Sequence, residues 1–365
     1  MAIKWIKALL LHIFEGANIA VVLLLWAAAA VTYISPEHHP YLSLLTLAFP
    51  IFLFTNVAFI VFWLIFKAKR VWIPIAGLAL CYSFVRDYCP INLPTEAADS
   101  SLTVLTFNTH GFGGQDAVDD EGTNGVVRYL AHSTADIICL QETYSNAFRT
   151  ALTDSLDAKG YHNVLYKGLS LYSRLPIVKS EELTFPTHHN SGFIAHLLCG
   201  PDTILLINNH FESNCFSPEM RQRYVDALEK TAANDRHSTA DSLIDDVKPL
   251  LRLMAEAAPR RAVQADIIDS IVTAWLPRPV ILCGDFNDTP VSYTHRLLTR
   301  NLTSAFRQSG NGLGLTYRER GFPVRIDHIL FSPQHWKSSS TRVDKTMNLS
   351  DHSPISTVLS PKSSF

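Results

Sequence analysis

The segment VILCGDFNDTP, residues 280–290, runs an apolar stretch directly into Asp285, Asn287 and Asp288. The apolar half is typical of a buried strand in a protein that mixes helices and strands. Removing a carboxylate from water is costly unless a cation or hydrogen bonds compensate for the lost hydration. We therefore expect a cation, or a reaction that uses a carboxylate, where this strand ends.

Other apolar stretches of the chain end in the same way. LTVLTFN ends in Asn108, ADIICLQE in Glu142 and TILLINNH in His210, while SDHSPI carries Asp351 and His352. One such residue is more often a turn former or a solvated side chain than a ligand. Because strand ends in one sheet gather at one edge, the recurrence predicts a single site there.

Helices and strands intermix over residues 101–360. Segments 124–133 and 145–160 have helical spacing, residues 192–210 read as a hairpin, and residues 218–275 are helical with breaks expected at Pro249 and Pro259. Hairpins together with crossovers favour a pair of mixed sheets covered by helices over a purely doubly wound sheet.

The first 90 residues hold nearly all the long apolar runs, although only 18% of the whole chain is charged. Residues 18–34 and 41–66 approach or exceed the length that crosses a bilayer, and residues 71–85 form a shorter third run. We interpret residues 1–88 as a transmembrane anchor of about three helices, 89–100 as a linker and 101–365 as a catalytic domain. A cleaved signal peptide and buried soluble helices are the alternatives.

Basic residues flank these runs unevenly. Lys4 and Lys7 precede the first run and KAKR (67–70) follows the second, whereas the loop SPEHHP between the runs has no Lys or Arg. The positive-inside rule places both basic segments in the cytoplasm. If residues 71–85 span the bilayer, the large domain lies outside, at a bacterial inner membrane on the periplasmic side. If they only lie in the interface, the domain is cytoplasmic.

Composition narrows the chemistry. The formal net charge of −2 gives no sign of a basic nucleic-acid surface, although a local cleft can be positive when the whole is not. No pair of the six cysteines has metal-ligand spacing, so a zinc centre is not expected.

The motifs LTFNTHGF, DIICLQET, INNHFES, LCGDFNDTP, RIDHILFS and LSDHSPI, in this order, resemble the endonuclease/exonuclease/phosphatase superfamily. The resemblance covers residues 101–360 and none of the apolar N-terminal part. It implies an α/β (α+β) four-layer sandwich, in which two packed mixed sheets are flanked by helices. It also implies a phosphoesterase that uses Mg²⁺ or Mn²⁺, which agrees with a donor set of oxygen ligands.

Carried over residue by residue, the resemblance implies a role for each strand-end side chain. Glu142 is the main metal ligand, with Asn108 beside it and Asp351 as a further ligand. Asp285 positions or deprotonates the attacking water, and Asn287 holds the phosphoryl oxygen. His352 stabilises the transition state with Asp327 orienting its ring, while His210, with Asn208 beside it, contacts the phosphate or protonates the leaving group.

Three other segments favour structural interpretations. Asp288 is interpreted as a turn residue, THHN (187–190) as a loop rather than a metal cluster, and PRRA (259–262) as a pair of arginines on a helix surface. One position departs from the resemblance: some nucleases of the superfamily place a carboxylate where Lys167 and Gly168 stand, so the partner of His210 is open.

The leading functional hypothesis is a membrane-anchored, metal-dependent enzyme that hydrolyses a phosphodiester or phosphomonoester. Its substrate is a lipid headgroup, a nucleotide or nucleic acid, and the anchor slightly favours lipid. A nuclease is the alternative within the class. A catalytically inactive scaffold or receptor is the alternative outside it, since fold alone does not establish function. No obligate protein partner is evident besides the lipid bilayer.

Overall fold

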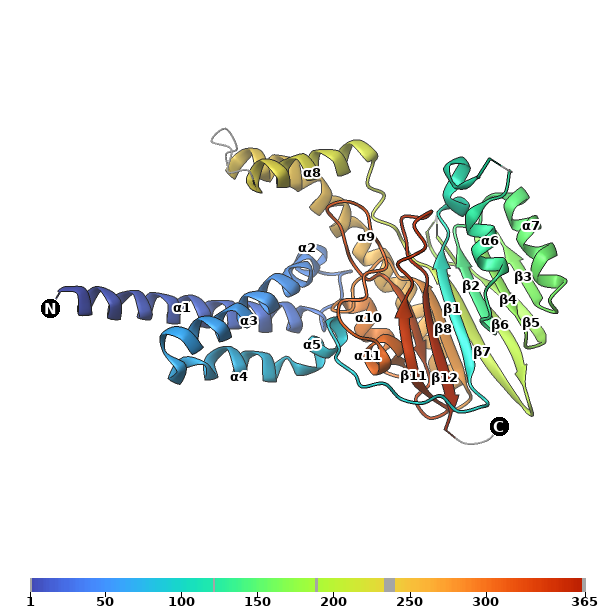
Figure 1. Ribbon diagram of the computed structural model, residues 1–365, viewed down its shortest axis with the longest axis horizontal. Coiled ribbons are helices and arrows are strands. Elements are labelled where there is room, and N and C mark those ends of the chain that lie inside the picture. Colours follow the sequence, from blue (N-terminus) through green and yellow to red (C-terminus); the bar gives the residue numbers. More distant parts are fainter. Residues whose placement is uncertain (1, 121, 188–189, 233–239, 363–365) are drawn as a thin grey trace.

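The computed structural model describes residues 2–120, 122–187, 190–232 and 240–362. Two six-stranded sheets pack face to face, with helices on both outer surfaces and a separate bundle of N-terminal helices at one side (Figure 1). The expected pair of packed mixed sheets flanked by helices is confirmed. His188 and His189 of the THHN segment lie outside the described residues.

The first sheet is mixed, with the order β11-β12-β1-β2-β4-β3. Its central pair, β1 and β2, is parallel, and the other pairs are antiparallel. Its strands are β1 (Leu102–Asn108), β2 (Ile137–Gln141), β3 (His162–Tyr166), β4 (Leu169–Ser173), β11 (Trp336–Val343) and β12 (Ile355–Pro361).

The second sheet is also mixed, with the order β5-β6-β7-β8-β10-β9. Its parallel pair is β7 with β8, and β6 and β7 form the expected hairpin. Its strands are β5 (Ile177–Leu183), β6 (Ser191–Cys199), β7 (Asp202–His210), β8 (Val280–Asp285), β9 (Thr303–Ser304) and β10 (Asp327–Phe331).

The alternation of side chains along the strands builds three core layers. In β1, Val104 faces the other sheet, while Leu105 and Phe107 face the helices outside. Neighbouring residues on a strand point to opposite faces, so a strand covered on both sides needs apolar residues at successive positions. This explains why the strands read as continuous apolar runs in the sequence.

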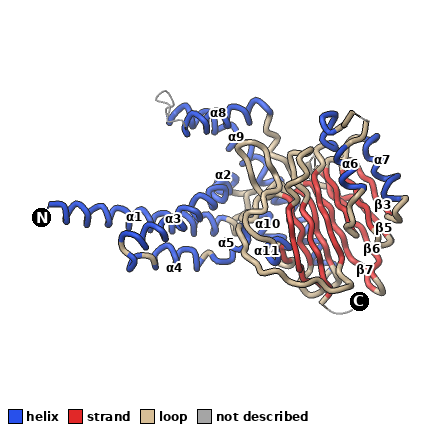
Figure 2. Tube along the Cα trace, viewed as in Figure 1, coloured by secondary structure: helices blue, strands red, loops and turns tan. Residues whose placement is uncertain are grey.

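Helices cover each outer face (Figure 2). Side chains of α6 (Gly125–Ala131) and α7 (Asn146–Asp157) pack on the first sheet. Side chains of α9 (Ala240–Trp275) and α10 (Tyr293–Leu298) pack on the second. Shorter elements complete this part of the chain: η3 (Gly111–Ala117), α8 (Pro218–Ala232) and α11 (Ala305–Ser309).

The breaks expected at Pro249 and Pro259 are wrong. Helix α9 is continuous over 36 residues and includes both prolines. Each proline removes one backbone donor and clashes with the preceding turn, which costs an isolated helix about 3 kcal/mol. Here α9 is held by its packing against α8, α10 and the short helix α2, and this tertiary packing outweighs the local penalty.

The N-terminal part forms a helical bundle made of α1 (Ala2–Val31), α2 (Pro40–Ser43), η1 (Leu44–Ala48), α3 (Phe49–Phe66), η2 (Ala68–Arg70), α4 (Trp72–Leu80) and α5 (Tyr82–Tyr88). Two segments, Lys4–Val31 and Pro40–Phe66, are long and apolar enough to cross a membrane. The expected third span is a pair, Ala68–Leu80 and Tyr82–Tyr88, bent by 72°. Two or three helices are therefore able to span a bilayer.

Polar side chains hold the bundle together inside. Trp63 donates its ring N–H to Asn18 at 2.9 Å, and Asn18 bonds Asn56. Arg70 contacts Glu15 at 2.8 Å, which explains how α1 carries a glutamate within its apolar run. Such contacts connect helices that pack without a hydrophobic driving force in lipid.

The end of the bundle docks on the sheet domain through arginines. Arg307 of α11 pairs with Asp87 at 2.7 Å, and the Arg296 guanidinium donates to the Thr32 carbonyl at 2.8 Å. Asn92, in the segment that follows α5, donates to the carbonyl oxygens of Arg307 and Gly310. The bundle and the sheets thus share a defined interface.

Candidate active site

The strand register brings the expected residues to one edge. In the parallel pairs, Asn108 lies beside Gln141 and His210 beside Asp285, and in the antiparallel pair Asp327 lies opposite Asp285. The carboxyl ends of β1, β2, β7 and β8 therefore meet the beginning of β10. Parallel strands place their carboxyl ends together, which is where sites form in such sheets.

Asn108 joins the two sheets at this edge. Its amide donates to Glu142 Oε1 at 2.9 Å and to Asp285 Oδ2 at 3.0 Å. Glu142 has a left-handed φ of 54°, which is uncommon for a residue other than glycine. Residues with such strained backbone angles cluster at functional sites. A carboxylate from each sheet is thus held by one amide.

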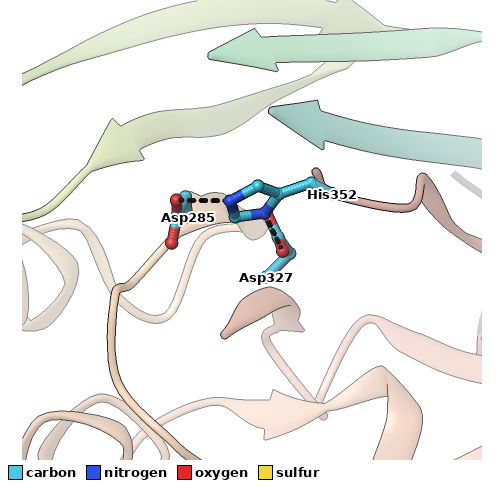
Figure 3. A group of neighbouring side chains, drawn as sticks. All are labelled: Asp285, Asp327 and His352. Atoms are coloured by element: carbon cyan, nitrogen blue, oxygen red, sulfur yellow. Dashed lines mark hydrogen bonds and ion pairs between the residues drawn. The ribbon is translucent and has the colours of Figure 1, made fainter. Parts of the chain in front are cut away.

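His352 lies between two buried carboxylates (Figure 3). Its Nδ1 is 2.8 Å from Asp327 Oδ2, and its Nε2 is 3.7 Å from Asp285 Oδ2. Thr316 supports Asp327 from behind, because the Asp327 backbone N–H donates to the Thr316 hydroxyl at 3.1 Å. The dyad that the resemblance implies is therefore assembled in this structure.

His210 approaches the same centre from β7. Its Nε2 is 3.7 Å from Asp285 Oδ2 and 3.8 Å from Glu142 Oε1. These two carboxylates stand beside His210 where the sequence left its partner open. A histidine between them is within reach of a phosphate bound at the same edge.

Burial and neighbouring charges shift the pKa values of Asp285 and His352. Burial and the repulsion of Asp327 raise the pKa of Asp285 to about 6. Burial alone would lower the pKa of His352, but Asp327 and Asp285 outweigh it and raise that pKa to about 10. At neutral pH the centre therefore contains an ionised Asp285 beside a protonated His352, which pairs a proton acceptor with a fixed positive charge.

Glu142 and Asp351 meet around a residue that the sequence analysis missed. His110 Nδ1 lies 3.7 Å from Glu142 Oε2 and 3.4 Å from Asp351 Oδ1. Burial opposes ionisation of Glu142, but His210 and the Asn108 amide outweigh it and lower its pKa. The carboxylates of Glu142 and Asp351 are oxygen donors of the kind that Mg²⁺ and Mn²⁺ prefer. The Asn108 amide nitrogen faces Glu142, while its oxygen accepts from the His110 backbone N–H at 3.1 Å.

A second acidic group deserves comparison as a metal centre. Donor atoms of Asp285, Asp327 and His352 lie within 4.8 Å of one another. Both ring nitrogens of His352 face carboxylates, and its pKa is raised, which favours the protonated ring over a ring with a lone pair for a metal. Asp285, Asp327 and His352 therefore suit proton chemistry better than metal binding.

Asn287 follows β8 in a left-handed turn with a φ of 50°. Its backbone N–H donates to Asp285 Oδ1 at 2.8 Å, and its side-chain amide donates to the Phe211 carbonyl at 3.0 Å. These two bonds fix the amide at the edge of the cavity, which Asn287 lines.

A cavity of about 290 Å³ opens over these residues. Side chains of Glu142, His210, Asp285, Asn287, Asp351 and His352 line it. Tyr317 lines it as well and packs its ring 5.0 Å from that of His352. Nothing in the local sequence of Tyr317 or His110 distinguishes them from loop residues, and only the fold brings them to the site.

Two structural interpretations from the sequence have different outcomes. Asp288 accepts from the Thr289 N–H in a turn, as expected, but it also faces Arg261 at 3.6 Å. Arg260 is 59% exposed, as expected for a helix surface, whereas Arg261 is 5% exposed and lines the cavity. The surface interpretation is therefore wrong for Arg261, because α9 turns that face toward the site.

Asn208 is not among the residues that line the cavity. It is fully buried between the sheets, where it accepts from Gln141 at 2.7 Å and donates to the carbonyl oxygens of Leu140 and Ser170. Successive residues of a strand point to opposite faces, so His210 and Asn208 share a face but differ in depth. Asn208 therefore links the sheets below the site.

Comparison with known proteins gives a family and a fold. The profile described as "Endonuclease/Exonuclease/phosphatase family" matches residues 105–352, and a profile described only as a domain of unknown function matches residues 11–88. No curated protein matches the sequence.

Solved structures share the sheet architecture. A humanised D. rerio TDP2 is 17% identical, with a TM-score of 0.50 over 72% of this chain and 99% of that one. The human Nocturnin catalytic domain, solved with a bound sulfate anion, is 16% identical, with a TM-score of 0.50 over 74% and 100%. At this identity the likeness concerns the fold alone.

Proposed function

Because the chain belongs to the endonuclease/exonuclease/phosphatase family over residues 105–352, we propose that it is a membrane-anchored, divalent-metal-dependent phosphoesterase. Members of this family are metal-dependent phosphoesterases and nucleases. The proposed reaction is hydrolysis of a phosphodiester or phosphomonoester by in-line attack of an activated water.

One observation carries the proposal. Asn108, Glu142, His210, Asp285 and His352 come from five separate segments, yet they are linked by contacts of 2.9–3.8 Å at one cavity. Buried carboxylates and histidines gathered in this way are costly to the fold unless they serve a site. The residues that the chemistry requires are all present.

Each side chain has a proposed task. Asp285, ionised above pH about 6, accepts the proton of the attacking water. The positive charge on His352, held by Asp327, and the Asn287 amide face the charge that builds on the phosphoryl oxygens. His210 donates a proton to the departing oxygen.

Glu142, Asn108 and Asp351 would hold the ion, which we propose is Mg²⁺ or Mn²⁺. When bound, such an ion polarises a phosphoryl oxygen and offsets its negative charge. The low pKa of Glu142 keeps this ligand ionised at neutral pH, as binding of a hard cation requires.

The experiment uses the full-length chain in detergent or vesicles with bis(p-nitrophenyl) phosphate. We expect turnover with Mg²⁺ or Mn²⁺, loss of turnover with EDTA, and a fall of about 100-fold in Glu142→Gln, which corresponds to about 3 kcal/mol. Glu181→Gln is the matched control, because Glu181 is an exposed acid on β5 far from the cavity.

Equal activity in Glu142→Gln and Glu181→Gln would overturn the proposed site. If the folded chain neither turns over a phosphate ester nor binds Mg²⁺ or Mn²⁺, the inactive scaffold becomes the better explanation. Panels of lipid, nucleotide and nucleic-acid substrates then separate a lipid phosphoesterase from a nuclease. We further propose a bacterial inner membrane location with the catalytic domain on the periplasmic side, because the basic segments lie away from that domain.

A further inference from the structure

The cavity over the catalytic residues is also lined by apolar side chains. They are Leu47, Met254, Phe216, Phe322, Val324 and Ile326. These residues come from four separate parts of the chain and share the cavity with the polar residues of the site. A substrate that fills the whole cavity must therefore carry an apolar group next to its phosphate.

The wall that contains Leu47 belongs to the membrane-spanning bundle. Leu47 lies in η1, which directly precedes the apolar helix α3, within the segment Pro40–Phe66 that is able to span a bilayer. Met254 lies on α9, and both α2 and η1 pack against that helix. The active-site wall is thus continuous with the end of the anchor that meets the membrane surface.

A smaller cavity extends the same wall between the anchor and α9. Its volume is about 20 Å³, and it shares Leu47, Met254, Arg261 and Asp288 with the larger cavity. It also reaches Pro36, between the two apolar segments, and Leu44, near the start of the second segment. A narrow seam therefore adjoins the larger cavity where the two apolar segments are connected.

Aromatic rings form another part of the cavity lining. The Phe322 ring lies 5.4 Å from that of Phe216 and 4.6 Å from that of Tyr224 on α8. Because these rings pack on one another, they form a fixed apolar surface. Leu47 and Met254 add to the apolar lining of the same cavity.

We propose that this apolar lining, together with the seam between η1 and α9, is a subsite for the hydrocarbon part of a membrane-dissolved phosphate ester. The phosphate then lies at Glu142, Asp285 and His352 while the chain extends toward the bilayer. The proposal rests on the proposed phosphoesterase function and names its substrate class: an amphiphile taken from the membrane.

The charges of the cavity favour this occupant over a nucleic acid. Its two arginines each face a carboxylate, Arg261 with Asp288 at 3.6 Å and Arg221 with Glu319 at 3.9 Å. A nucleic-acid site needs cations available to several phosphates in a row. The cavity instead combines one group of polar catalytic residues with apolar side chains.

The first experiment measures chain-length dependence with the full-length protein in vesicles. Its substrates are methyl, hexyl and dodecyl esters of p-nitrophenyl phosphate. Because each buried methylene adds favourable free energy of binding, kcat/KM should rise about tenfold or more from the methyl to the dodecyl ester. The near-isosteric variants Met254→Gln and Leu47→Asn should lower the dodecyl-to-methyl ratio of kcat/KM about tenfold.

The matched control is Leu251→Gln, on the same helix as Met254 but outside both cavities. Leu251→Gln should leave the dodecyl-to-methyl ratio of kcat/KM unchanged. Partitioning of the substrate into the vesicle affects this variant and the wild type equally. A ratio that stays at the wild-type value in both Met254→Gln and Leu47→Asn would overturn the proposal. So would faster hydrolysis of thymidine 5′-(p-nitrophenyl) phosphate than of the dodecyl ester, because it would indicate a nucleotide site.

A second measurement does not depend on turnover. Dodecyl phosphate with a diazirine at the end of its chain is cross-linked to the full-length protein, and the labelled peptides are identified by mass spectrometry. Labels in residues 44–47 and 254–258 that excess dodecyl phosphate removes support the subsite, and labels confined elsewhere overturn it. Labelling of residues 44–47 and 254–258 without any hydrolysis would support the subsite and contradict the phosphoesterase function. Hydrolysis without labelling of these residues would support the phosphoesterase function and contradict the subsite.

Discussion

At the scale of single residues, the charge of His352 depends on Asp327. The carboxylate lies 2.8 Å from the ring, and together with Asp285 it raises the pKa of His352 to about 10 although burial acts in the opposite direction. The positive ring is therefore maintained across the neutral range. In a phosphoesterase, a protonated ring of this kind supplies a fixed positive charge. This charge needs no rearrangement when the phosphoryl group becomes more negative.

The substitution Asp327→Asn tests this dependence. With an uncharged partner the pKa of His352 falls, so the ring loses its proton at a lower pH. In the wild type, activity should rise as Asp285 ionises through pH about 6 and fall as His352 deprotonates near pH about 10. In Asp327→Asn the alkaline fall moves toward neutral pH, and kcat decreases on the order of 10²-fold at pH 8.

The measurement is a pH profile of kcat with bis(p-nitrophenyl) phosphate in the wild type and the variant. Asp344→Asn is the matched control, since Asp344 is a partly buried acid that bonds Tyr129 and lies outside the cavity. An alkaline limb at the same pH in wild type and Asp327→Asn would contradict the role given to this carboxylate.

The sequence could predict the residues at strand ends but not those that reach the site from loops or helix faces. Asn108, Glu142, His210 and Asp285 each follow an apolar run, which is a visible signal. His110 and Arg261 have no such signal. His110 enters through a left-handed turn with a φ of 47°, and Arg261 is turned inward by the packing of α9. Their positions follow from tertiary structure alone.

At the scale of elements, the end of β8 requires a glycine. Gly284 has a φ of 144°, and a Cβ at this position would stand 1.9 Å from the Asn209 carbonyl oxygen on β7. The close approach of the two strands sets His210 beside Asp285. We expect Gly284→Ala to lower the free energy of unfolding by about 3 kcal/mol and to reduce activity sharply.

The matched control for this prediction is Gly160→Ala after helix α7. Gly160 also has a positive φ, 80°, but a Cβ there would meet no atom within 4 Å among the described residues. Its substitution costs only the backbone penalty, about 1 kcal/mol. Denaturant unfolding monitored by circular dichroism compares the two, and an equal loss would show that the contact with Asn209 is unimportant.

One element differs from the sequence-based expectation. Pro249 and Pro259 do not end α9. Local signals describe the cost of a conformation in isolation, whereas this helix is set by the neighbours that pack against it. In β8 and in the β6–β7 hairpin, the local signals agree with the surroundings. The sequence therefore predicted these strands correctly.

At the scale of the whole molecule, the catalytic domain is fixed to the end of the helical bundle. Asp87 of α5 pairs with Arg307 of α11 at 2.7 Å, and its carbonyl oxygen also accepts from Arg325. We expect Asp87→Ala to loosen this interface, because it removes a partly buried, charge-assisted hydrogen bond worth at least about 1.4 kcal/mol. Proteolytic cleavage within residues 90–100 should then become about tenfold faster.

The control for this substitution is Glu229→Ala, which removes an ion pair with Arg320 that is exposed on both sides. Exposed pairs contribute little, so cleavage of the linker should stay at the wild-type rate. If Asp87→Ala and Glu229→Ala are cleaved equally slowly, the interface is held by its apolar contacts and not by these arginines.

The orientation of the whole chain follows from the two ends of the bundle. The N-terminus and the basic turn Lys67–Arg70 lie at the end away from the sheets, and the catalytic domain lies at the other (Figure 1). Because basic flanks stay in the cytoplasm, the domain should face the opposite compartment.

A membrane-impermeant maleimide tests this orientation in intact spheroplasts. It should label Cys215, which is exposed on the sheet domain. In the double variant Cys215→Ser/Lys69→Cys, it should label Lys69→Cys only after the membrane is permeabilised. The single variant Cys215→Ser measures the background labelling of the other cysteines. Labelling of Lys69→Cys without permeabilisation would contradict the proposed orientation. It would place the cavity, with its seam beside α9, at the cytoplasmic leaflet.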